Sequence, residues 1–116
     1  MNPQLQILIG DLRQRALQGL EDFDAEWRAS GIPRALELHG EAVLRANVRY
    51  HAASDLENVL CGRCPVEDVM RELVCASAPM GSAFPPSRLS GVARSIMQEE
   101  ARAILELLKD SERPGH

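Results

Sequence analysis

Two cysteines in a Cys-x-x-Cys spacing, Cys61 and Cys64, have the clearest potential for chemistry. Redox-active dithiols and half of a tetrahedral zinc site share this spacing. A thioredoxin-like enzyme needs alternating strands and helices around the pair, and the sequence shows none. The nearest further ligands are Cys75 and His51, but a helix over 65–77 would hold Cys75 roughly 16 Å from Cys64. We expect buried or turn cysteines, with a thiol- or zinc-dependent sensor using Cys61 and Cys64 as an alternative.

Arg45 and His51 form a second pairing with catalytic potential. Five residues separate them, and this spacing resembles the R-x4-6-H motif of HEPN-type ribonucleases, which are small all-α dimers. The resemblance implies a ribonuclease with Arg45 and His51 in its active site. That family often has a polar residue next to the arginine, and Asn47 is not adjacent to Arg45. The simpler interpretation is that Arg45, Arg49 and His51 form a solvated face.

Acidic residues stand out at two places in the sequence. Glu100 falls inside an apolar stripe, where a carboxylate is costly unless it is paired. We therefore expect Glu100 to meet an arginine across an interface and to help fix the packing register. The second group comprises Glu21, Asp22, Asp24 and Glu26. We expect these residues to form a solvated face, or alternatively a patch that binds a basic partner. Glycine-rich phosphate loops, HExxH motifs and EF-hand patterns do not occur in the sequence.

The sequence predicts a long amphipathic helix over residues 3–30. Asn2 and Pro3 suit its start, and Gly31 followed by Pro33 suits its end. Apolar residues at gaps of three and four form one face: Leu5, Leu8, Leu12, Ala16, Leu20, Phe23 and Trp27. Ile7 and Leu17 fall outside this face. We expect these two residues on a second contact surface, or singly exposed.

Residues 33–53 are compatible with two structures. Apolar residues alternate with polar ones near 44–51, and His39-Gly40 can form a turn, which favours a short hairpin within 34–51. As a helix, the segment carries a weak core stripe of Leu36, Gly40, Val43, Asn47 and Tyr50. Two strands alone are marginally stable, and no third strand is evident. We therefore expect a helix, with an α+β fold as the alternative.

Further helices follow in the second half of the chain. Ser54–Glu57 matches a capping box, which predicts a new helix that ends near Gly62. Cys64-Pro65 then starts a helix that ends near Ser77. Residues 78–87 predict a loop with Phe84 as an apolar anchor, and a final helix covers 88–110.

The final helix has apolar residues on more than half of its circumference. One stripe comprises Leu89, Val92, Ala93, Ile96, Ala103, Ile104 and Leu107, and Met97, Ala101, Leu105 and Leu108 extend it. A surface helix needs an apolar arc of only about 100°. We therefore expect the far side of this helix to be buried against another chain. Met97, Leu105 and Leu108 thus join Ile7 and Leu17 as candidate protein-binding residues.

The composition limits the class of protein. The 116 residues, 45% hydrophobic and 26% charged, predict one helical domain over 1–116. A net charge of -4 argues against nucleic-acid binding, and no apolar run is long enough to cross a membrane. The first residues do not match a secretory signal, and three cysteines cannot all pair within one chain, so we expect a reducing cytoplasm. Twelve of the thirteen basic residues are Arg, which indicates a GC-rich, bacterial or phage genome.

Taken together, these patterns predict an all-α fold, a compact helical assembly with long N- and C-terminal helices. They favour a small non-enzymatic regulatory protein without metal or cofactor. We expect it to bind another protein, such as a transcription factor or an enzyme, through apolar helix faces. As an inhibitor or anti-activator it would block or displace that partner's interface. A large apolar patch seldom stays in water, so we expect a homodimer when the partner is absent.

Overall fold

The computed structural model describes residues 3–77 and 91–111. These residues form four helices and no strand: α1 (Pro3–Ser30), α2 (Ile32–Leu60), α3 (Val66–Ser77) and α4 (Gly91–Ser111). The predicted all-α fold is therefore confirmed, and residues 33–53 are helical, not a hairpin. Within the described ranges, no helix is long and apolar enough to cross a membrane. Phe84 and the whole predicted loop over 78–87 lie outside the described residues.

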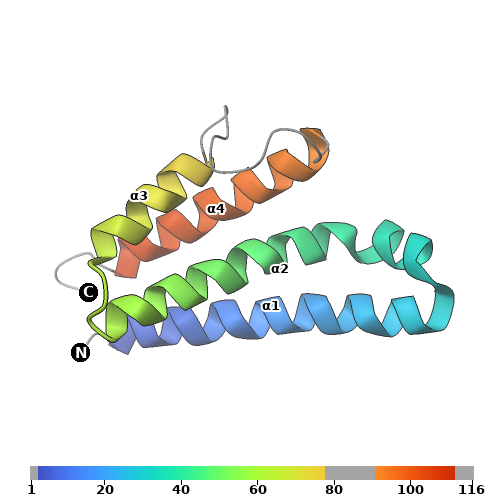
Figure 1. Ribbon diagram of the computed structural model, residues 1–116, viewed down its shortest axis with the longest axis horizontal. Coiled ribbons are helices and arrows are strands. Elements are labelled where there is room, and N and C mark those ends of the chain that lie inside the picture. The colour runs from blue at the N-terminus through green and yellow to red at the C-terminus, as the bar shows by residue number, and fades with distance from the viewer. Residues whose placement is uncertain (1–2, 78–90, 112–116) are drawn as a thin grey trace.

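Helices α1 and α2 form an antiparallel hairpin (Figure 1). Gly31 alone separates them, and its φ of 90° is a conformation that glycine adopts without strain. Small residues let the helices approach closely, since a Cβ at Gly19 would lie 3.1 Å from the carbonyl oxygen of Ala42. Ala46 contacts the same place and is fully buried. The hairpin has the most extensive contact between any two helices.

The predicted helix start at Ser54 is wrong, because α2 continues without a break to Leu60. Ala52, Ala53 and Leu56 are buried in the core, so packing holds this stretch in the same helix. The helix ends at Cys61, and Gly62 has a φ of 76° in the turn that leads to α3. That end and the α3 helix agree with the sequence prediction.

Helices α3 and α4 lie side by side along one side of α2 (Figure 1). All four helices contribute to the main apolar core, whose most completely buried large side chains are Leu12, Leu56, Ile104 and Leu108. Helix α3 packs mainly on α4 and contacts α2 much less. This unequal packing positions the groove described below.

The expectation that Met97, Leu105 and Leu108 lie on an exposed face is wrong. All three are buried in the core of this single chain. The physical reason is that α4 contacts α1, α2 and α3, so its wide apolar arc is covered from several directions. The large apolar residues that α4 does expose are Val92 and Leu107.

We predict that Leu105→Ala and Leu108→Ala each lower the free energy of unfolding by about 2–5 kcal/mol, because each leaves a cavity in the core. Urea unfolding followed by circular dichroism measures the change. The matched control is Ile7→Ala, whose side chain is 71% exposed and whose effect we expect within about 0.5 kcal/mol. Equal effects at all three positions would show that the two leucines are surface residues.

Candidate binding surfaces

Glu100 is a buried carboxylate held by two arginines of α2. It is 5% exposed, and the side chains of Arg45 and Arg49 are only about one-fifth exposed. Arg49 Nε donates to Glu100 Oε2 at 2.8 Å, and Arg45 Nη1 donates to Oε1 at 3.1 Å. Arg45 Nη2 also reaches Glu99 Oε1 at 3.2 Å. The cluster joins α4 to α2.

The structure thus gives Arg45 and Arg49 a structural role and removes them from the predicted solvated face. Burial lowers the pKa of Arg45, but its hydrogen bonds to Glu100 and Glu99 together with nearby acidic charges outweigh this effect. The pKa of Arg45 is therefore raised above its ordinary value. His51 is not part of this cluster and lines a groove between α2 and α3. Of the two residues with the HEPN-like spacing, Arg45 is therefore held by the carboxylates of α4, while His51 faces the groove. Glu100 meets its arginines within the chain and not across an interface between chains.

We predict that Glu100→Ala lowers the free energy of unfolding by about 3 kcal/mol, because two partly buried guanidinium groups lose their carboxylate. Glu99→Ala is the matched control, since its carboxylate also contacts Arg45 but its side chain is 70% exposed. We expect the control to cost less than about 1 kcal/mol. Similar losses for the two variants in urea unfolding would contradict the structural role of Glu100.

The three cysteines are free thiols in this structure. Cys61 is exposed at the end of α2, and Cys64 is half-buried against the core. Cys75 is exposed on α3. Within residues 3–77 and 91–111, no three His, Cys, Asp or Glu side chains are placed to hold a metal ion. Cys61 and Cys64 occupy the predicted turn, and the sensor hypothesis gains no ligand set from these parts of the chain.

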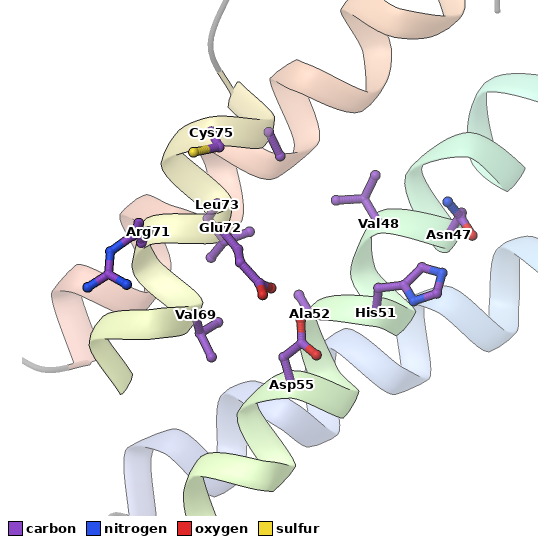
Figure 2. A pocket seen from close by; sticks show the side chains of 11 residues that line it. Asn47, Val48, His51, Ala52, Asp55, Val69, Arg71, Glu72, Leu73 and Cys75 are labelled. Atoms are coloured by element: carbon purple, nitrogen blue, oxygen red, sulfur yellow. The ribbon is translucent and has the colours of Figure 1, made fainter. Parts of the chain in front are cut away.

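An open groove lies between α2 and α3, with a cavity volume of about 520 Å³ (Figure 2). Its apolar lining consists of Val48, Ala52, Val69, Leu73 and Ala76, and its polar lining of Asn47, His51, Asp55, Arg71, Glu72 and Cys75. The groove exists because α3 contacts α4 more than α2. Ligand sites in proteins share this combination of an apolar lining with a few polar groups.

Two carboxylates face each other across this groove. Figure 2 shows Asp55 extending from α2 toward Glu72 on α3, while the guanidinium group of Arg71 points away. Burial raises the pKa of Glu72, and the charge and hydrogen bond of Asp55 and the charge of Asp68 raise it further. Two carboxylates can hydrogen-bond to each other only when one is protonated. Glu72 therefore keeps its proton to a higher pH than an isolated glutamate does.

We predict that Glu72→Gln stabilises the protein at pH 7 by no more than about 1 kcal/mol, since solvent screens this open site. The folded protein holds the Glu72 proton more tightly than the unfolded chain does. The contribution of Glu72 to the free energy of unfolding is therefore fully present below the ordinary glutamate pKa and is lost as pH rises through the raised pKa of the folded protein. Unfolding curves of wild type and variant should converge below about pH 4. A stability difference between wild type and Glu72→Gln that does not change with pH would contradict the raised pKa of Glu72.

A second surface consists of the large apolar side chains that α1 and α2 leave exposed or half-buried along the hairpin. We call it the outer face and define it by Leu17, Leu20 and Trp27 on α1 and Ile32, Leu36, Val43 and Tyr50 on α2; Asn47 lies at its border with the groove. A shallow depression of about 210 Å³, lined by Leu20, Val43, Ala46, Asn47 and Tyr50, joins the two helices there. Leu17, Leu36 and Tyr50 are each more than half exposed. Leu17 is thus a predicted contact residue that the structure leaves exposed.

The α2 part of the outer face has heptad spacing. Leu36, Val43 and Tyr50 recur every seven residues, and Gly40 and Asn47 occupy the positions between them. This alternation of three- and four-residue steps is the pattern by which one helix packs along another. A Cβ at Gly40 would meet nothing within 4 Å, so the position leaves open space for a neighbouring helix. Ile7 is also exposed, but it lies nearly three turns from Leu17 along α1.

The sequence contains a signal for the outer face but none for the groove. The heptad of α2 looked like a weak core stripe, and its glycine and asparagine are the reason. Asp55 and Glu72 have no spacing that links them, because they lie on different helices. Comparison of the chain with protein-family models, with curated proteins and with solved structures finds no match.

Proposed function

We propose that the protein is a small non-enzymatic regulator that binds another protein through the outer face. The observation that carries this proposal is a heptad-spaced apolar surface left exposed on a hairpin whose other side is already packed. Isolated exposed apolar residues are normal, but a contiguous patch of them marks an interaction site. The proposed contact residues are now Leu17, Leu20, Leu36, Val43 and Tyr50.

The proposed occupant is an apolar helix of the partner. Heptad spacing on α2 suits a helix that packs along it, and Gly40 permits a close approach. Glu21 follows Leu17 by one helical turn and places an acidic group along the α1 edge, whereas Asp24, one turn after Leu20, is paired with Arg28. A partner helix with Arg or Lys beside its apolar stripe would complement this edge.

Binding of such a helix gives a direct regulatory mechanism. Apolar helices with heptad spacing often form the dimer interface of their own protein, and the outer face would cover that stripe. The protein would then prevent dimerisation of a transcription factor or block an enzyme that needs the same helix. When no partner is present, a second copy would cover the face and give a homodimer. The three free cysteines are compatible with a reducing compartment, and we place the protein in the cytoplasm.

We predict that a photo-crosslinking amino acid at position 36 captures one discrete protein in a native lysate. Mass spectrometry of the crosslinked peptide should identify a helical segment with apolar heptads and basic neighbours. A synthetic peptide of that segment should bind the wild-type protein, and Leu36→Glu and Val43→Glu should each weaken it at least about tenfold, or 1.4 kcal/mol.

The matched control places the same crosslinker at Ile7 and uses Ile7→Glu. Ile7 is as exposed as the outer-face residues but lies elsewhere on α1, so neither change should affect capture or binding. Circular dichroism of each variant checks that the helices remain folded. Capture of only a second copy of the chain, or equal capture from positions 7 and 36, would overturn the proposal.

A further inference from the structure

We propose that the groove between α2 and α3 binds a small organic cation, an ammonium or guanidinium group on an apolar body, with the cation between Asp55 and Glu72. This site is separate from the outer face, and the inference goes beyond the proposed function. It requires three properties of the groove: a suitable size, an apolar floor and a negative charge that the protein itself leaves available. Each of these is a property of the described residues.

The size and floor of the groove fit a small molecule. Its volume of about 520 Å³ lies within the range of roughly 300–1,000 Å³ that is typical of ligand sites. Val48, Ala52, Val69 and Leu73 are each less than 9% exposed, so the floor is made of well-packed side chains. Two packed helices supply these residues, which makes the groove largely pre-formed. An apolar ligand body would gain free energy by leaving water for this floor.

The charged groups that face the groove favour a cation. Helix α2 supplies His51 and Asp55 to the lining, and α3 supplies Arg71 and Glu72; the charge of Asp68, which does not line the groove, also acts on Glu72. Arg71 Nη1 bonds to Asp68 Oδ1 at 3.3 Å, and its guanidinium group points away from the groove (Figure 2). Arg71 therefore leaves the carboxylates of Asp55 and Glu72 facing each other in the groove. An ammonium group between the two carboxylates would offset their mutual repulsion, which contributes to the raised pKa of Glu72.

Binding of the cation requires both carboxylates to be ionised. An ammonium ligand binds with its own protons between two ionised carboxylates, so a proton held by Glu72 must leave to solvent before the cation can bind. Binding should therefore weaken as pH falls through the raised pKa of Glu72 and reach full strength above it.

The test uses 2-phenylethylamine as the probe and 2-phenylethanol as its neutral counterpart. Isothermal titration calorimetry with the full chain at pH 7 should give saturable binding of the amine, at least tenfold tighter than that of the alcohol. Asp55→Asn and Glu72→Gln should each weaken amine binding at least tenfold and leave alcohol binding unchanged. Repeating the amine titration at about pH 4, the ordinary glutamate value, should give weaker binding than at pH 7.

Two controls keep the result specific. Glu67→Gln removes an exposed carboxylate of α3 that does not line the groove, and it should leave amine binding unchanged. Leu36→Glu alters the outer face only and should also retain amine binding, so failure of the proposed function would not affect this result. Because Glu72→Gln is expected to stabilise the fold, its loss of binding cannot be attributed to unfolding. No amine binding, equal binding of amine and alcohol, or an equal loss in Glu67→Gln would overturn the inference.

Discussion

The arrangement of the molecule depends on one buried carboxylate. Helix α4 is apolar around most of its circumference, so apolar packing alone permits several rotations of this helix against α2. Only one rotation places Glu100 against both Arg45 and Arg49. Since an unpaired charge there would cost several kcal/mol, the other rotations are disfavoured. The ion cluster therefore determines which side of α2 becomes the core.

Helix α2 is consequently the element that every surface shares. Its alanines pack on α1, its arginines and Leu56 meet α4, and Val48 and Ala52 form part of the groove opposite α3. The remaining side forms the outer face. Helix α3 packs mainly on α4 and contacts α2 much less, so the groove between α2 and α3 stays partly open. Both candidate sites thus result from the same distribution of side chains around one helix.

Much of the fold could be predicted from periodicity, but the covering of each apolar face could not. The stripe from Leu5 to Trp27 predicted α1, and the turn glycines predicted where α1 and α2 end. The same reasoning misplaced Leu105 and Leu108, because periodicity shows that a face is apolar without showing what packs on it. The capping-box pattern at Ser54 failed because tertiary packing outweighs a local signal. Asp55 and Glu72 meet only through the tertiary arrangement of α2 and α3, so no local pattern could predict their pairing.

The single-residue turn at Gly31 has a consequence for the order of folding. The most extensive helix contact joins two helices that are consecutive in the chain, so closing it costs little loop entropy. Contacts of this kind form quickly, typically within microseconds to milliseconds. The α1–α2 hairpin is thus suited to assemble before α4 returns across α2 and completes the core. All residues of the outer face lie on this hairpin, so the outer face is formed as soon as α1 and α2 have packed together.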